Sequence, residues 1–374
     1  ETVKFNSSRE IMKGFVVGEF MGPSASISLG NSSLSLHTAM RSYTAIDRIP
    51  AVIGQIVTDE SVENVEDGIY IMKRGRGKTM SWGEVGLTYG SVIDVNEQRN
   101  TMLNGAVGVK RVYGIQQASF IVDEGRVDVE NAKGYFKYAS GSYSYTKPAW
   151  KSGKGWGFDL GLVYKKMIDK VGGYKPHSQR GGCQRLNYRY KIGLSVIDLG
   201  KVKYTKEAFY ANIDDGTKLE DMEEVVKDER VDSDELLNEG YEYAASLPTA
   251  ASLQVDFSMG YGIYLNAMIL QNLTSPKNFG VERANLLAFT PRYEKMRFAL
   301  SLPISMADYT EPQVGLAVRY GPVSVGSDHL IPFLAKTDIY GADIYFNVNI
   351  HIFNSPWCKQ KSAGTYEKWI CPVW

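Results

Sequence analysis

Hydrophobic and polar residues alternate over long stretches of this chain, most clearly along residues 185–197. Successive side chains of a β-strand point to opposite faces, so this stretch predicts a strand with one apolar and one polar face. Its length suits a membrane-crossing strand of about 9–11 residues better than the usual soluble strand of about 5–6. The apolar parity consists of Leu186, Tyr188, Tyr190, Ile192, Leu194 and Val196.

The same alternation recurs from the first 50 residues to residue 353, with Gly-containing turns between the segments. Roughly 14 to 16 strand candidates follow one another in hairpin succession, the range of a mid-sized outer-membrane barrel. One segment alone fits a soluble β-sandwich equally well, but the number of hairpins, the strand lengths and the 24 tyrosines favour the barrel. We therefore predict an all-β fold, an antiparallel transmembrane β-barrel of roughly 14 strands, over residues 1–353, with residues 354–374 as a Cys- and Trp-containing tail.

Three stretches lack the alternation, and we expect long loops at residues 47–79, 166–182 and 214–247. The third is acidic and carries Leu219, Met222, Val225 and Val226 at helical spacing. The sequence leaves two interpretations open, a short helical insertion or an acidic loop without regular structure. Gly77-Lys78-Thr79 does not form a phosphate-binding motif, because the required glycine five positions ahead is Met72.

Charge and composition limit the functional classes. Lys plus Arg and Asp plus Glu number 42 each, so the chain has no net positive charge that would favour binding of nucleic acid. No stretch reaches the roughly 18 uninterrupted apolar residues of a membrane helix. We expect no enzymatic activity, no cofactor and no metal site, because none of the four histidines lies in a catalytic pattern and the cysteines form no CxxC pair. Cys358 and Cys371 form either a small disulfide loop or remain free thiols, and the sequence does not decide between them.

Charged residues occupy the polar parity of many predicted strands. An arginine or lysine facing lipid at mid-bilayer costs about 2–4 kcal/mol, so these side chains are expected to face the barrel lumen and pair across it. Such pairs either fill a closed barrel or line a pore. The predicted lumen network comprises Asp159, Arg189, Lys191, Asp256, Arg292, Arg297, Arg319, Asp328 and Asp343.

The order of motifs after residue 247 resembles a known family. Leu247-Pro248-Thr249-Ala250 is followed by the segment Leu-Ala-Phe-Thr-Pro-Arg-Tyr-Glu at 287–294 and by Gly-Leu-Ala-Val-Arg-Tyr-Gly-Pro at 315–322. This order is similar to that of a Bacteroidota outer-membrane barrel family that carries a domain-of-unknown-function label and is broadly similar to FadL-like and PorV-like barrels.

The resemblance implies a protein of the cell outer membrane that contacts membrane lipid and other envelope proteins. Its implied role is that of a non-enzymatic subunit or accessory of an envelope complex, in particular of the type IX protein secretion system. Two alternatives stay open at this point. One is a FadL-like outer-membrane transporter of a small hydrophobic molecule, and the other is a soluble periplasmic β-rich binding protein.

Overall fold

The computed structural model describes residues 11–29, 31–50, 68–130, 133–171, 187–213, 237–295, 298–330 and 341–349. These residues form one antiparallel β-sheet and contain no helix, so the all-β prediction is confirmed for this part of the chain. Within the same ranges, no helix has the length and apolar character that crossing a membrane would require.

The described residues of the sheet form twenty strands. They are β1 (Ile11–Met21), β2 (Ala25–Leu29), β3 (Ser32–Pro50), β4 (Gly68–Asn96), β5 (Thr101–Glu130), β6 (Lys133–Thr146), β7 (Gly153–Met167), β8 (Tyr188–Tyr204), β9 (Ala208–Ile213), β10 (Leu237–Gly240), β11 (Tyr243–Ser246), β12 (Ala250–Gly260), β13 (Ile263–Asn272), β14 (Leu286–Glu294), β15 (Phe298–Ser301), β16 (Ile304–Ala307), β17 (Glu311–Val314), β18 (Leu316–Tyr320), β19 (Val323–Ser327) and β20 (Tyr345–Val348).

Several of these strands are parts of one longer strand. β15 and β16 both pair with β14 in a single register, interrupted at Leu302-Pro303, and β11 and β12 both pair with β8 in a single register, interrupted around Pro248. When elements that follow one another along the same neighbouring strands are joined, thirteen strands result: β1/β2, β3, β4, β5, β6/β7, β8/β9, β10/β11/β12, β13, β14, β15/β16, β17/β18, β19 and β20. This number is close to the roughly 14 strands expected for the chain.

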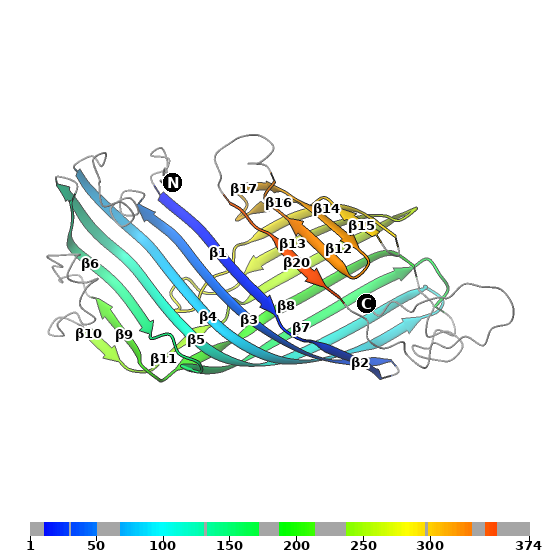
Figure 1. Cartoon of the computed structure of the whole chain (residues 1–374), viewed down its shortest axis with the longest axis horizontal. Helices are drawn as coiled ribbons and strands as arrows, with labels where there is room; N and C mark the ends of the chain where they lie inside the picture. Colours follow the sequence, from blue (N-terminus) through cyan, green and yellow to red (C-terminus); the bar gives the residue numbers. More distant parts are fainter. Residues whose placement is uncertain are drawn as a thin grey trace.

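The sheet is curled but open (Figure 1). Among the described residues, β1 and β2 pair with β3 alone, and β20 pairs with β19 alone, so the two edges do not meet. The curling brings distant strands face to face. Arg41 of β3 contacts Asp198 of β8 at 3.2 Å, although β4, β5 and β7 lie between these strands in the sheet. We call the face that carries this contact the inner face and the opposite one the outer face.

The long strands extend far past the rest of the sheet. β4 has 29 residues and β5 has 30, which corresponds to roughly 95 Å of extended chain at about 3.3 Å per residue. We call the end of the sheet formed by β6, β9, β10, β11 and the adjoining parts of β3, β4, β5 and β8 the extension. In Figure 1 it occupies the left of the molecule.

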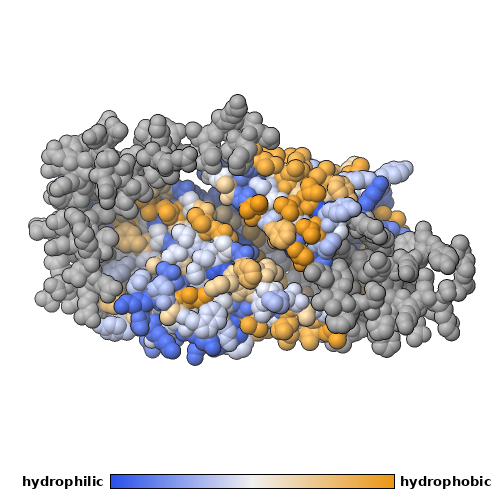
Figure 2. Space-filling model, in the orientation of Figure 1, coloured by the Kyte–Doolittle hydropathy of each residue, from blue (hydrophilic) through white to orange (hydrophobic). Residues whose placement is uncertain are grey.

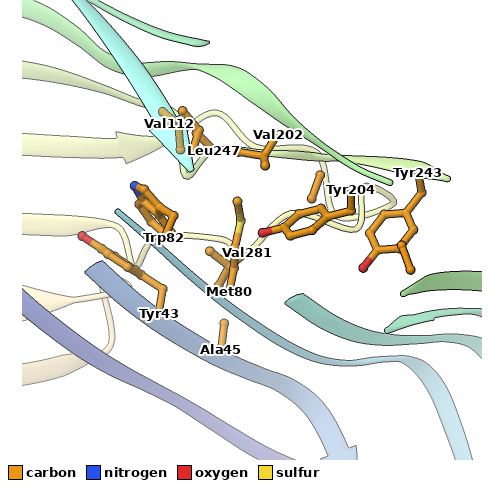
Figure 3. Close-up of a cluster of buried hydrophobic side chains, with 12 residues drawn as sticks. Tyr43, Ala45, Met80, Trp82, Val112, Val202, Tyr204, Tyr243, Leu247 and Val281 are labelled. Carbon is orange, nitrogen blue, oxygen red and sulfur yellow. The ribbon is translucent and has the colours of Figure 1, made fainter. Parts of the chain in front are cut away.

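The inner face of the extension holds the main apolar core (Figure 3). Trp82 and Tyr204 are fully buried, and stacked ring pairs join Tyr43 to Trp82 at 5.5 Å and Tyr204 to Tyr243 at 5.4 Å between ring centroids. We call this group the inner cluster. Its members are Tyr43, Ala45, Met80, Trp82, Val112, Val202, Tyr204, Ala208, Tyr243, Ala245, Leu247 and Val281.

The connection between β13 and β14, residues 273–285, folds onto the inner face of the extension. Val281 is fully buried in the inner cluster, and Phe279 packs on Tyr243 with ring centroids 5.5 Å apart. The Lys78 ammonium donates hydrogen bonds to the carbonyls of Pro276 and Asn278, at 2.9 and 2.7 Å. We call this segment the inner loop, because it fills space that the curled sheet encloses.

Two of the stretches expected to be loops contain strands in the structure. The polar stretch 47–79 contains the end of β3 and the first part of β4, so the described part of it is sheet. Its basic residues alternate with glycines and give no apolar alternation, but residues 68–79 pair with β5, and residues 76–79 pair with β3 as well. In the acidic stretch 214–247, Leu219, Met222, Val225 and Val226 lie outside the described residues, while residues 237–240 and 243–246 are the strands β10 and β11.

Candidate functional site

Large apolar side chains are exposed on the outer face of most strands outside the extension. Along β7, Phe158, Leu160 and Leu162 are 43–49% exposed, whereas the alternate residues of the strand are more covered. We call this surface the apolar belt. It includes Val85, Leu87, Val107, Val109, Phe158, Leu160, Leu162, Ile192, Leu194, Leu253, Val255, Phe257, Ile269, Leu287, Phe289, Leu300, Ile304, Leu316, Val318 and Val325.

The belt is continuous because the strand register places its residues side by side. One lateral row crosses six strands, and every neighbouring pair in it is directly opposed: Leu162, Leu194, Leu253, Ile269, Leu287 and Met306. Figure 2 shows apolar side chains gathered over β12 to β17 and more hydrophilic side chains near β11. The largest apolar patch on a typical soluble monomer covers only about 300–600 Å², so a row that spans half of a sheet marks a surface made for an apolar environment.

Aromatic residues flank the belt. On β7, Trp156 and Tyr164 both point outward, and Tyr164 lies eight positions after Trp156, roughly 26 Å along an extended strand. Tyr164 contacts Tyr190 of β8 with ring centroids 6.3 Å apart. Outer-membrane barrels carry an apolar band about 25 Å tall between two aromatic girdles, so the spacing on β7 matches that architecture.

Behind the belt, the inner face carries a buried charge network centred on Asp198. The Asp198 carboxylate is 1% exposed and accepts hydrogen bonds from Arg41, Lys110 and Arg283, which come from β3, β5 and the inner loop. Lys110 also contacts Asp159 of β7 at 2.9 Å. Three cations around one buried carboxylate offset the cost of removing that charge from water.

Glu84 joins this network from β4. Its carboxylate has no exposed side-chain area, lies 3.4 Å from Arg41 and accepts a hydrogen bond from the Trp82 indole at 3.0 Å. Trp82 therefore links the charge network to the inner cluster. Arg41 also lies 3.8 Å from Glu19 of β1, and Glu19 accepts a hydrogen bond from the Tyr43 hydroxyl.

A second network lies further along the inner face. The buried Asp256 of β12 contacts Lys191 at 3.0 Å and Arg292 at 2.8 Å, and it accepts a hydrogen bond from the Tyr188 hydroxyl at 3.1 Å. Arg292 and Arg319 both contact Glu294, at 3.3 and 3.4 Å. These residues come from β8, β12, β14 and β18, and Lys191 and Asp256 lie directly opposite each other on the neighbouring strands β8 and β12.

The structure brings together most residues of the predicted network, although in separate groups. Asp159 lies in the first group, and Lys191, Asp256, Arg292 and Arg319 lie in the second. Asp328 and Asp343 lie together near the end of β19, where Asp343 accepts a hydrogen bond from the backbone N–H of Asp328 at 2.8 Å. Arg297 lies outside the described residues, as do Cys358 and Cys371.

The expected position of Arg189 is wrong. Pairing between β7 and β8 shifts between Lys166 and Met167, so Met167 faces Tyr188 while Lys166 faces Tyr190. The extra residue reverses the parity of β8 at this point, and Tyr188 replaces Arg189 on the inner face, where it contacts Asp256. Arg189 is exposed. A bulge of this kind re-aims side chains and cannot be read from alternation.

The Asp343 carboxylate also contacts His329, with Nδ1 2.7 Å from Oδ1. The Ser327 hydroxyl donates to the same carboxylate at 3.3 Å and makes no described contact with the His329 ring. In a hydrolytic triad the serine bonds the second imidazole nitrogen instead, so this arrangement differs from that of a triad. No group of three metal-ligating side chains is found in the ranges that the structure describes.

A cavity of about 190 Å³ lies between β1, β3, β4 and the inner loop. Eight of its twelve lining residues are charged, namely Lys13, Asp47, Arg48, Arg76, Lys78, Glu282, Arg283 and Asp308. Glu282 contacts Arg76 and Lys78, both at 3.1 Å, and Lys13 contacts Asp308 at 2.7 Å. The cavity is therefore a polar space crossed by ion pairs.

Polar groups of the extension are also paired on its inner face. The Gln117 amide donates to the Phe279 carbonyl at 2.6 Å and its oxygen accepts hydrogen bonds from Ser144 and Tyr243. Burial raises the pKa of the Tyr243 phenol, so the group stays neutral and serves as a donor. These bonds hold the inner loop against β5 and β11.

Sequence reasoning missed the residues at the centre of the first network. Asp198 lies in the bulge of the β7–β8 pairing, where Phe158 pairs with Leu199 and Leu160 pairs with Val196, so its parity differs from that of Lys191 and Gly193. Glu282 and Arg283 lie in a connection without alternation. Lys110 and Glu84 were recognisable, because both lie on the polar parity of alternating stretches.

Comparisons with known proteins give one family match. A profile described as "Family of unknown function (DUF5723)" matches residues 7–328. No curated protein sequence matches the chain. Among solved structures, the ferric yersiniabactin uptake receptor FyuA from Yersinia pestis is similar at 8% identity and a TM-score of 0.31, with 81% of this chain and 40% of that chain covered. This chain thus spans less than half of that receptor's length.

Proposed function

This chain belongs to the DUF5723 family of unknown function, and we propose that it is an outer-membrane β-barrel that serves as a non-enzymatic subunit of an envelope complex. The observation that carries the membrane part is the apolar belt. Lipid is the environment in which a continuous exposed band of Leu, Val, Ile and Phe on a β-sheet is stable. On this proposal the two edges of the sheet are paired in the membrane, because an unpaired edge in hydrocarbon leaves backbone groups without partners.

The paired inner face supports a structural role rather than conduction. The network around Asp198 joins strands that lie apart in the sheet, the network around Asp256 ties β12 to nearby strands, and the inner loop fills the extension. A conducting barrel needs a continuous water-filled path, and these contacts would have to open for one to form. The resemblance to PorV-like barrels adds the finer proposal that the complex belongs to a type IX protein secretion system.

The alternative of a FadL-like transporter of a hydrophobic molecule has less support. The cavity beside the inner loop is lined mainly by charged residues, and an apolar ligand would leave them without water or partners. The alternative of a soluble binding protein conflicts with the belt, which would expose its apolar side chains to water.

Fractionation tests the membrane location. We expect a tagged chain to stay with washed outer membranes at high salt, to require detergent for extraction, and to migrate differently on a gel before and after boiling. Recovery in the soluble fraction without detergent would overturn the proposal.

Crosslinking in intact cells before extraction tests the partner role. We expect specific envelope proteins to be recovered with the chain after detergent solubilisation, including proteins of a secretion system. A monomer that carries a bound small hydrophobic molecule and no crosslinked protein would replace the proposal with the transporter alternative.

A further inference from the structure

Five cations gather on the outer face at the boundary between the apolar belt and the extension. The register places them in two adjacent rows. Arg111, Trp156 and Lys201 oppose one another across β5, β7 and β8, and Tyr113, Lys154 and Lys203 form the next row. Lys151 lies beside them, with its ammonium 5.2 Å from the centre of the Tyr113 ring. We call Arg111, Lys151, Lys154, Lys201 and Lys203 the basic patch.

Placing these cations next to one another does not stabilise the folded sheet. Lys154 and Lys203 are directly opposite on neighbouring strands, where like charges repel. Lys203 contacts Glu242 at 2.5 Å, but both side chains are more than half exposed, so water screens this pair. Within the described residues, Lys154 and Lys201 contact no carboxylate. The five cations of the patch thus contact a single carboxylate, Glu242, among the described residues, and the patch carries a net positive charge.

Aromatic rings lie among the cations. The Arg111 guanidinium stacks 4.8 Å from the centre of the Trp156 ring, and Trp150 stacks on Tyr113 with ring centroids 6.3 Å apart. Trp150 and Trp156 are 61% and 52% exposed. Exposed tryptophan and tyrosine with lysine and arginine are typical of the level where lipid headgroups meet the hydrocarbon.

From this juxtaposition we propose that the basic patch binds the phosphate of an anionic membrane lipid, whose acyl chains lie on the adjoining belt. The inference rests on the membrane location proposed above. The patch is part of an exposed sheet face and continues directly into Phe158 and Leu199, which are 43% and 49% exposed on the same face. A lipid matches both parts of this surface, because it carries a charged headgroup and an apolar tail.

The experiment compares two triple variants of the full chain in lipid nanodiscs. Lys154→Gln/Lys201→Gln/Lys203→Gln removes the exposed lysines of the patch. Lys73→Gln/Lys277→Gln/Lys295→Gln removes the same charge from exposed positions elsewhere. The discs contain phosphatidylcholine with a minor fraction of phosphatidylglycerol, and native mass spectrometry measures how much phosphatidylglycerol the released protein retains.

We expect the patch variant to lose at least about tenfold of the preference for phosphatidylglycerol, given the attraction of each lysine to an anionic surface, and the control to lose little. Equal retention by both variants would overturn the inference. Displacement of the lipid by inorganic phosphate at matched concentration would also overturn it, because the site would then recognise a free anion. Failure of the wild-type chain to insert into the discs would instead refute the proposed membrane function.

Discussion

The apolar belt and the extension are built from the same antiparallel sheet, yet their two faces have opposite polarity. In the belt, Leu160 and Leu162 point outward while Asp159 and Lys165 lie on the inner parity. In the extension, Trp82 and Tyr204 are buried on the inner face. Outward positions there carry exposed ion pairs such as Lys73 with Glu124 and Lys203 with Glu242.

The difference shows that one sheet serves two environments. The extension resembles a soluble protein, whose apolar residues avoid water by packing inside. The belt resembles a membrane barrel, where the apolar side faces out and polar groups are satisfied inside. The change occurs along single strands: β4 carries buried Met80 and Trp82 on its inner parity, then buried Glu84 on the same parity two positions later.

The largest expected effect comes from the core of the extension. Trp82→Ala removes a fully buried ring and its hydrogen bond to Glu84, so the free energy of unfolding should fall by about 3–5 kcal/mol. Trp156→Ala removes an exposed ring and one cation–π contact, and its cost should be about 1 kcal/mol. Urea titrations of both variants in phospholipid vesicles measure the difference. Equal losses would mean that the extension has no core of its own.

A similar loss is expected at the centre of the inner charge network. Asp198→Asn leaves Arg41, Lys110 and Arg283 without their shared carboxylate, and breaking a buried ion pair costs about 3–5 kcal/mol. Glu242→Gln breaks the exposed pair with Lys203 and should cost at most about 1 kcal/mol. The same urea titration compares them, and added salt should reduce the effect of the second variant. A loss below about 1 kcal/mol for Asp198→Asn would show that water reaches this network.

A third variant pair tests the outer faces directly. Leu194→Arg places a charge in the middle of the belt and should cost about 2–4 kcal/mol in a bilayer. Ala244→Arg places the same side chain on the exposed outer face of the extension, where a surface substitution changes stability by about 0.5 kcal/mol or less. If Leu194→Arg is as well tolerated as Ala244→Arg, the belt does not face lipid.

The sequence by itself determined most of the strands, but not the first part of β4, and it determined which side chains share a face over most of each strand. Side-chain alternation depends on backbone geometry alone, so Leu194 and Ile192 fall on one face and Lys191 and Gly193 on the other without knowledge of the fold. The motif order after residue 247 also resembled a family with a domain-of-unknown-function label, and a family of unknown function does match residues 7–328.

Only the tertiary structure decided the exact partners. A bulge moves one residue out of pairing and reverses the faces beyond it, which put Tyr188 in the place expected for Arg189 and turned Asp198 inward. The inner loop brought Glu282 and Arg283 to strands about 200 and 240 positions earlier in the chain. Such contacts depend on how the sheet curls. Because the curl accumulates from small twists between many neighbouring strands, it cannot be predicted from a local pattern of residues.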